Sequence, residues 1–346
     1  MTHMAAQAAE RPAKTAANPA GVRSRQIQVM RGVACILLVF FHVVGGGASD
    51  GLRVSDDTVL RKLMDFLLYI RMPIFGFLSG YVYALKPMRA GEAKPFLRGK
   101  ARRLVLPLAA VSTLFFLVWN AWYGNLGAAL PGMWRIYVFS YEIYWFLQAM
   151  VLIFLAVALL EGLGVLSRWT GVAAGAALAF VAGHPLENVT FLSLGGALYL
   201  APYFLAGLAT FRFGLTARPS VLIAVAVLVC AAAILHGWRV AHLPHDVVAA
   251  RVTVLSLIIG AGGSLLLLRS VPDTVWLARI GASSFAIFLF HIFFVVAART
   301  VLGRLGEPPL GLHIAAGLAA GLAGPMVLEL VLMRWAGTRR MFLGLR

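Results

Sequence analysis

Apolar stretches about as long as a membrane-spanning helix follow one another along nearly the whole chain. An α-helix rises 1.5 Å per residue, so roughly 20 apolar residues cross the hydrocarbon core of a bilayer. The fifth stretch is short, and a tilted or partial span would also account for it. The pattern predicts an all-α, polytopic membrane helical bundle of about ten transmembrane helices. We place them near 29–47, 65–85, 104–122, 144–162, 169–183, 191–211, 219–237, 252–268, 283–302 and 312–333.

The composition supports a chain whose main solvent is lipid. Of the 346 residues, 61% are hydrophobic and 12% are charged, which is roughly half the charged fraction of a soluble domain. Both cysteines, Cys35 and Cys230, lie within apolar runs. This position argues against a disulfide framework and suits small buried side chains. We expect no metal site.

The two ends of the chain are basic and lack apolar periodicity. We expect residues 1–28 to form a disordered, alanine-rich cytoplasmic tail, followed by one membrane domain over 29–335 and a second basic tail over 336–346. The first apolar run and the small residues after it imitate a secretory signal peptide. We do not expect cleavage, because His42 interrupts that run and many spans follow it.

Lysine and arginine are distributed unevenly between the loops. The formal net charge of +17 would suit nucleic acid, but the cations lie between apolar segments and not on a soluble face. With ten spans, twenty of the 30 basic residues fall on the side of the termini and eight on the other. The positive-inside rule then predicts that both termini are cytoplasmic. An anionic cytoplasmic ligand is a second reason for this surplus of positive charge.

Two ionisable side chains lie inside the first apolar segment. Arg31 and His42 are eleven residues apart, which is close to three helical turns and puts both on one face, about 16 Å apart along the axis. An arginine at the bilayer centre costs about 2.5–3.5 kcal/mol on the insertion scale, so this pair indicates a functional site. Histidine suits proton transfer near neutral pH. The alternatives are a snorkelling Arg31 and a packing His42; Cys35, on the same face, is an acyl carrier or a packing residue.

The second apolar segment contains a buried arginine beside small residues. Arg71 has apolar residues on both sides, and Pro73 should kink the helix and free a carbonyl group. Gly76, Ser79 and Gly80 permit the close approach of a thin ligand or of another helix. Helix packing would explain the glycines but not Arg71.

A dense group of cations follows the second segment. The loop ahead of Pro107 carries four of them within six residues, Arg98, Lys100, Arg102 and Arg103. Such a group suits a phosphate-rich cytoplasmic ligand. A topology signal that also holds anionic lipid explains the charge more simply when the charge is considered alone.

Further candidate residues lie in two later segments. Tyr144 and Trp145 suit an interfacial aromatic belt or stacking on a sugar, and Glu142 is a candidate for a second acid or base. In the ninth segment, Ser284 and His291 lie two turns apart on one face. We expect His291 near mid-membrane, where packing or hydrogen bonding is at least as good an explanation as catalysis.

Together these features resemble the bacterial integral-membrane acyltransferases known as acyltransferase family three. Its hallmark is an arginine or lysine, ten residues, and then a histidine in the first helix, which Arg31 and His42 match. The resemblance covers roughly residues 26–335 and keeps the ten-helix plan. Many members have a second histidine beside the first, whereas Phe41 and Val43 flank His42 here. Further motifs resemble residues 71–81, the basic stretch 100–107 and, more weakly, 145–147 and 281–291.

The resemblance implies a multi-pass enzyme of the bacterial inner membrane. It would transfer an acyl group, most often acetyl, from a cytoplasmic acyl-coenzyme A to a hydroxyl at the outer face. Acetyl-coenzyme A or another acyl-coenzyme A would be the donor substrate, with no bound cofactor. The acceptor would be a glycan or glycolipid of the cell envelope, or an exopolysaccharide.

We hypothesise a division of roles among the candidate residues. His42 would be the general base or, as an alternative, a transient acyl carrier, and Arg71 would stabilise the oxyanion or orient the pantetheine arm. Arg31 would hold donor phosphate near the cytoplasmic mouth. Ser79 and Gly80 would line the path of the pantetheine, and the nucleotide end would lie against the four cations Arg98, Lys100, Arg102 and Arg103.

A proton-coupled transporter or flippase is the alternative class. Intramembrane arginine and histidine also mark proton-coupled transport. The lack of internal repeats, the scarcity of intramembrane acids and the family motifs favour the enzyme. A non-catalytic relative is a third possibility, against which the intact set of Arg31, His42 and Arg71 weighs. Donor-dependent acylation without solute flux would separate an enzyme from a transporter.

Overall fold

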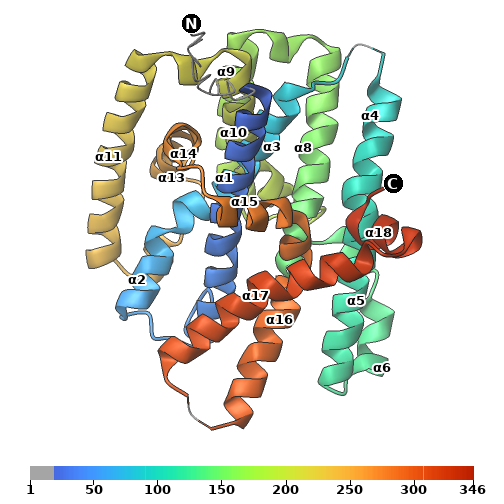
Figure 1. Cartoon of the computed structure of the whole chain (residues 1–346). Coiled ribbons are helices and arrows are strands. Elements are labelled where there is room, and N and C mark those ends of the chain that lie inside the picture. Colours follow the sequence, from blue (N-terminus) through green and yellow to red (C-terminus); the bar gives the residue numbers. More distant parts are fainter. Residues whose placement is uncertain (1–18, 90, 307) are drawn as a thin grey trace, which may run out of the picture.

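The structure is a bundle of helices, as Figure 1 shows. It is a computed structural model that describes residues 19–89, 91–306 and 308–346. Among these residues, nine helices are long and apolar enough to cross a membrane, and Val254–Ser270 is a shorter apolar helix. The prediction of an all-α, polytopic membrane protein is confirmed. The nine are α1 (Pro19–Val44), α2 with α3 (Val59–Phe66 and Leu68–Leu85), α4 through α5 (Ala93–Trp122), α8 (Trp145–Gly162), α9 (Trp169–Leu186), α10 (Leu194–Arg212), α11 (Pro219–His242), α16 (Ser284–Arg304) and α17 (Leu310–Leu332).

Short helices connect these spans. The shorter apolar helix consists of two α-helical pieces joined by a π-helical turn. Phe139 and Phe191 form an isolated bridge between two connecting segments. The short elements are α6 (Leu126–Ala129), α7 (Arg135–Val138), α12 (His245–Val248), α13 (Val254–Leu257), α14 (Gly263–Ser270), α15 (Val275–Ala282) and α18 (Ala336–Leu343).

Three segments differ clearly from the prediction. Helix α1 begins at Pro19, so only residues 1–18 of the predicted tail remain, and these lie outside the described residues. The predicted basic loop is helical, because α4 (Ala93–Lys100) continues through a π-helical turn, Ala101–Val105, into α5 (Leu106–Trp122). Helix α15 was not predicted. Hydropathy windows miss such segments because charged side chains at a membrane edge lower their mean without breaking the helix.

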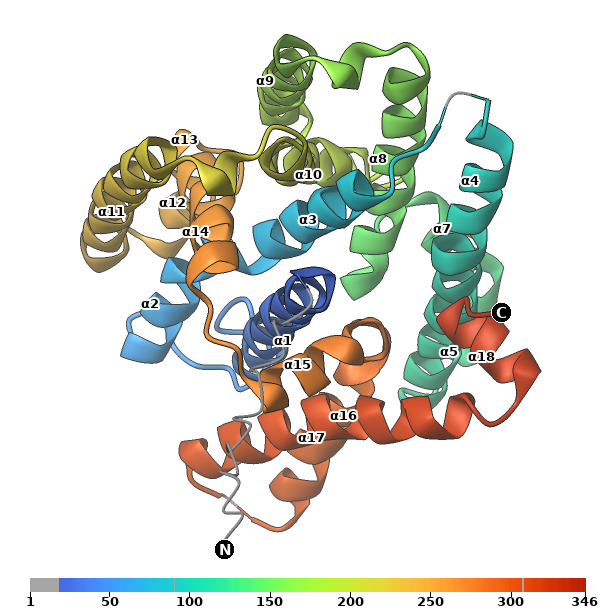
Figure 2. The same ribbon diagram turned by 45° about the horizontal axis from the view of Figure 1, so that its top comes forward.

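Helix α1 lies near the middle of the bundle, as the view in Figure 2 shows. It packs closely against α15 through two glycines: a Cβ at Gly32 would lie 2.2 Å from the Leu277 carbonyl oxygen, and one at Gly281 only 1.7 Å from that of Gln28. Helix α17 packs on the other half of α1 through Gly317, whose added Cβ would meet Val43. Small residues are the usual means of close helix packing in lipid.

Helices α3 and α10 form a second close pair. A Cβ at Gly80 would lie 1.8 Å from the Phe204 carbonyl oxygen, and one at Gly207 would lie 1.9 Å from that of Phe77. The Ser79 hydroxyl donates to the Phe75 carbonyl oxygen of its own helix at 2.7 Å. At Gly80 the contact with α10 favours the helix-packing explanation over the path of a thin ligand.

We expect Gly80→Ala to destabilise the fold. The added methyl group must push α3 away from α10, and overpacking of this kind costs about 1–3 kcal/mol. Thermal unfolding of the purified protein in detergent would measure the loss. Gly99→Ala is the matched control, because no atom lies within 4 Å of a Cβ at Gly99. Equal melting temperatures for the two variants would contradict this account of the α3–α10 contact.

Candidate active site

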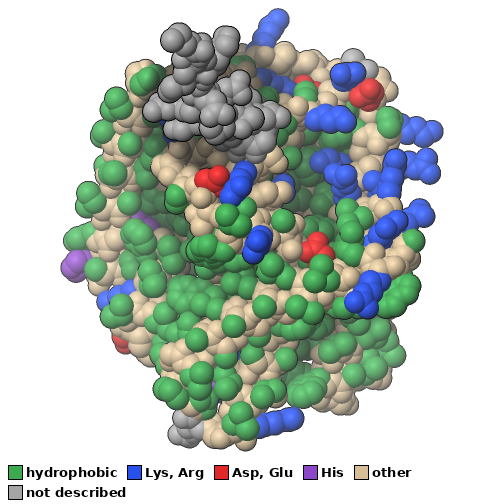
Figure 3. All heavy atoms as spheres, in the orientation of Figure 1, with side chains coloured by type: hydrophobic (Ala, Val, Ile, Leu, Met, Phe, Trp, Pro, Cys, Tyr) green, Lys and Arg blue, Asp and Glu red, His purple; other side chains and the backbone are tan. Residues whose placement is uncertain are grey.

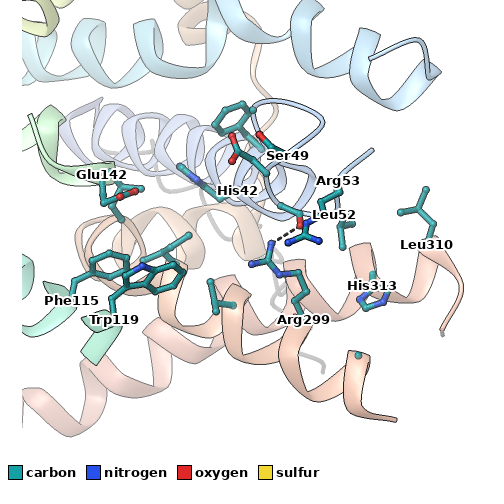
Figure 4. Close-up of a pocket in the computed structure, with 18 of the residues that line it drawn as sticks. His42, Ser49, Leu52, Arg53, Phe115, Trp119, Glu142, Arg299, Leu310 and His313 are labelled. Carbon is teal, nitrogen blue, oxygen red and sulfur yellow. Dashed lines mark hydrogen bonds between the residues drawn. The ribbon is translucent and has the colours of Figure 1, made fainter. Parts of the chain in front are cut away.

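A large cavity lies at the C-terminal end of α1. Its volume is about 950 Å³, at the upper end of the range for small-molecule sites. Figure 4 shows His42, Glu142 and Arg299 around this space. Its remaining walls come from the loop after α1, from α5, α16 and the start of α17.

The loop after α1 is held by a buried arginine. Arg61, on α2, is fully buried and donates hydrogen bonds to the carbonyl oxygens of Gly45, Gly47 and Val54. On the cavity side, Arg299 donates to the Gly51 carbonyl oxygen at 2.5 Å. Gly45 and Gly51 have φ angles of +99° and +55°, which glycine adopts without strain. Gly46, Ser49 and Gly51 of this loop line the cavity.

Two histidines meet at the inner end of the cavity. The ring of His42 lines the cavity, and its centroid lies 4.9 Å from that of His291 on α16. His291 is fully buried, and its Nδ1–H donates to the Ile287 carbonyl oxygen at 2.8 Å. A carbonyl only accepts, so the proton of neutral His291 is on Nδ1. Its Nε2 has no hydrogen-bond partner among the described residues and can accept one.

Arg71 lies close to the histidines but outside the cavity wall. Its guanidinium carbon is 3.3 Å from the centroid of the Phe41 ring, and Phe41 lines the cavity next to His42. Such a cation–π contact stabilises a buried guanidinium. The positive charge of Arg71 also acts on His42 through space. Only 7% of Arg71 is exposed, so it presents its charge from behind Phe41.

Arg31 lies nearer the other end of α1. It is half-buried, and its charge acts on Cys35. Cys35 itself is fully buried, with its thiol 4.0 Å from the Ser284 carbonyl oxygen. Neither side chain lines the cavity. This position favours packing over acyl transfer for Cys35.

The predicted acceptor-side residues take different positions. Glu142 and Trp145 line the cavity. Glu142 has a left-handed φ of +43°, a strained conformation of the kind that clusters at functional sites. Tyr144 is fully buried, and its hydroxyl donates to the Leu289 carbonyl oxygen at 3.3 Å. The interpretation of Tyr144 as a belt residue or a sugar-stacking residue is therefore wrong, because its buried ring packs against Phe115 of α5. Burial and the neighbouring Glu142 raise the pKa of Tyr141 to about 12.

The predicted donor cations lie on the helix that runs from α4 into α5. Arg98 and Arg103 are exposed, whereas Lys100 and Arg102 are half-buried. The Lys100 ammonium lies 3.5 Å from the centroid of the Phe154 ring. Lys100 is thus held against α8, and Arg98 and Arg103 are free to meet a ligand.

The family of this chain follows from a comparison with models of known protein families. A family model described as an acyltransferase domain, acyltransferase family 3, matches residues 24–330. The chain belongs to this acyltransferase family. No curated protein and no solved structure matches it. The protein is thus a multi-pass membrane acyltransferase. Among the described residues of the acyltransferase, no group of three or more His, Cys, Asp or Glu side chains is placed to hold a metal ion.

Several residues of this acyltransferase's cavity were not predicted from the sequence. Asp50, Arg53, Arg299 and His313 line it. The burial of Arg61 had a signal in the sequence, because Arg61, Met64 and Asp65 have the spacing of one helix face. The structure buries all three. The cavity-lining loop residues carry no such periodicity, so only the folded chain reveals them.

We expect Arg61→Ala to disorder the cavity wall of the acyltransferase. The substitution leaves three backbone carbonyls without their donor, and each buried unsatisfied group costs about 1–3 kcal/mol. Limited proteolysis within residues 45–56 and thermal unfolding would measure the loss. Lys62→Ala is the matched control, since its ammonium makes an exposed contact at 3.3 Å with the Ala241 carbonyl oxygen. An Arg61→Ala protein as protease-resistant as the control would refute this role.

Proposed function

We propose that the protein transfers an acyl group, acetyl in the first instance, from cytoplasmic acyl-coenzyme A to a hydroxyl of a cell-envelope glycan on the outer side of a bacterial inner membrane. The observation that carries the proposal is the position of His42. Its ring lines a cavity of about 950 Å³, and the ring of the buried His291 lies 4.9 Å from it. A group in this position can take a proton from an acceptor in the cavity while the donor approaches through the protein interior.

The chemistry is direct acyl transfer with His42 as general base. His42 removes the proton of the acceptor hydroxyl as its oxygen attacks the thioester carbonyl carbon. The carbon–sulfur bond then breaks, and the coenzyme A thiolate leaves and takes up the proton from His42. General base catalysis of this kind contributes typically 10²–10⁴ in rate. Acyl transfer through His42 itself is the alternative, and it would leave an acyl-imidazole that the acceptor then attacks.

Two further side chains support His42 in this scheme. His291 offers its unpartnered Nε2 as the acceptor for one N–H of His42, which would aim the other nitrogen at the acceptor hydroxyl. Arg71, behind Phe41, would stabilise the negative charge that develops on the thioester oxygen. Arg31 would attract donor phosphate on the opposite half of α1.

The cavity suits a glycan acceptor with an apolar anchor. Trp119, Tyr123 and Trp145 offer rings for stacking on sugar faces, and Glu142 and Asp50 offer carboxylates for hydroxyl groups. A second cavity of about 320 Å³ lies beside the first, between α5 and α16, and its lining is largely apolar. A lipid-linked acceptor could place its chain there and its sugar in the larger cavity.

We expect His42→Ala to lower turnover by roughly 10²–10⁴ while coenzyme A binding stays within about twofold of the unmodified protein. Transfer of labelled acetyl from acetyl-coenzyme A in membranes measures the first, and calorimetry on purified protein measures the second. His242→Ala is the control, because His242 is exposed on α11, away from the cavity. Turnover of His42→Ala at the level of the control would reject the assignment.

We expect His291→Ala to lower kcat by about 10-fold or more and to change the pH profile of kcat. The reason is that His42 loses the group that orients its ring. The Asn side chain also carries an acceptor oxygen, so His291→Asn should recover part of the activity with the original pH profile. Steady-state kinetics from pH 5 to 9 would measure both. If the two variants lost activity equally with unchanged profiles, His291 would be a packing residue only.

A further inference from the structure

The C-terminal helix brings additional arginines to the predicted donor cations. Helix α18 packs on α5 and on the π-helical turn, and a Cβ at Gly344 would lie 2.6 Å from the Arg102 carbonyl oxygen. Arg102 interacts electrostatically with Arg340 and Arg346 as well as with Arg103. Figure 3 shows Lys and Arg side chains gathered over α4 and α18 on this face of the molecule. We call Arg102, Arg103, Arg340 and Arg346 the α18 cation cluster.

The cluster has no acidic partner within the described part of the chain. None of its four arginines takes part in any of the ion pairs there, which occupy arginines elsewhere. The Nε of Arg102 is buried without a hydrogen-bond partner, and so is that of Arg339 on the same helix α18. Like charges repel at short range, and a buried guanidinium nitrogen without an acceptor is unfavourable. A ligand that carries several phosphate oxygens would remove both penalties.

The position of α18 is set by packing and not by the charges. Leu343 is buried in the core, and the Phe342 ring lies 6.2 Å from that of Phe290. Gly344 ends the helix with a φ of +64°, and its N–H donates to the Arg340 carbonyl oxygen at 3.1 Å. This αL cap turns the chain so that Arg346 comes back to Arg102.

The same contacts connect the cluster with the catalytic centre. Phe290, against which α18 packs, directly precedes His291, and the His291 ring adjoins that of His42. A long ligand with its phosphates on the cluster would thus have its other end on the side of α16 that leads to the histidines. Acyl-coenzyme A has this shape, with a phosphorylated nucleotide at one end and a thioester at the other.

We propose that α18 completes the phosphate-binding site for the donor, with Arg340 and Arg346 binding phosphate oxygens together with Arg102 and Arg103. This inference rests on the proposed function for the identity of the donor. The ligand chemistry is that of clustered phosphates, which arginine binds through paired N–H donors. Anionic lipid headgroups present the same chemistry, and the experiment must separate the two sources.

The test is binding of coenzyme A to the full chain in nanodiscs of phosphatidylcholine alone. Arg340→Gln with Arg346→Gln should raise the dissociation constant of coenzyme A by about 10-fold or more, since each 10-fold change corresponds to about 1.4 kcal/mol. Arg334→Gln is the matched control, because Arg334 is exposed just before α18 and lies outside the cluster. Arg340→Lys with Arg346→Lys, which keeps both charges, should bind coenzyme A more tightly than Arg340→Gln with Arg346→Gln. In turnover assays, the donor KM should rise while kcat changes little.

The other outcomes decide against the proposal in distinguishable ways. Unchanged coenzyme A binding in a Gln double variant that keeps its melting temperature would remove α18 from the donor site. If that variant instead lost only phosphatidylglycerol, measured by native mass spectrometry from mixed nanodiscs, the cluster would be a lipid site. If the unmodified protein bound no coenzyme A at millimolar concentration, the proposed donor itself would be wrong. Loss of pyrophosphate binding in the Gln variant would then still identify the cluster as a phosphate site.

Discussion

Close backbone contact between helices is the constraint on which this structure depends. In lipid, one apolar surface gains little by exchanging lipid for another helix, so association relies on close packing. The pairs α1–α15 and α3–α10 achieve it through Gly32, Gly281, Gly80 and Gly207, where an added Cβ would lie within 2.2 Å of a carbonyl oxygen. Because α1 carries His42 and α3 carries Arg71, these contacts also position the candidate catalytic residues.

The polar groups beside the cavity, Arg71 and His291, are stabilised by neutral partners. Arg71 lies over the Phe41 ring, and His291 donates to a carbonyl of its own helix. Arg61 differs, because it combines three backbone carbonyls with an ion pair to Asp56. Neutral partners of this kind hold a cation in place without neutralising its charge. They also hold an imidazole through one ring nitrogen and leave the other nitrogen able to accept a hydrogen bond. The Nε2 of His291 therefore remains available beside His42, and the charge of Arg71 remains available behind the cavity.

Much of the fold could be predicted because lipid forces each span to satisfy its own backbone hydrogen bonds. Hydropathy alone thus located nine long spans and the shorter Val254–Ser270. The candidate site was harder. The spacing of Arg31 and His42 predicted that they share one helix face, but in the structure only His42 lines the cavity. Helical spacing shows which residues share a face and not what packs against that face. The contact between His291 and His42 forms between helices that are far apart in the sequence. No local sequence pattern predicts such a contact.

The sequence by itself determined that this is a helical membrane protein of the acyltransferase family with ionisable residues inside its first two spans. Composition and the order of motifs can be read from the sequence alone, without knowing how the helices pack. Only the tertiary structure decided what fills each close approach: α10 at Gly80, α18 beside Arg102, and the loop after α1 around Arg61. The physical reason is that a small residue allows another helix to approach closely, and a buried cation requires polar partners. Which helix or which partner this is depends on how elements distant in the sequence pack together.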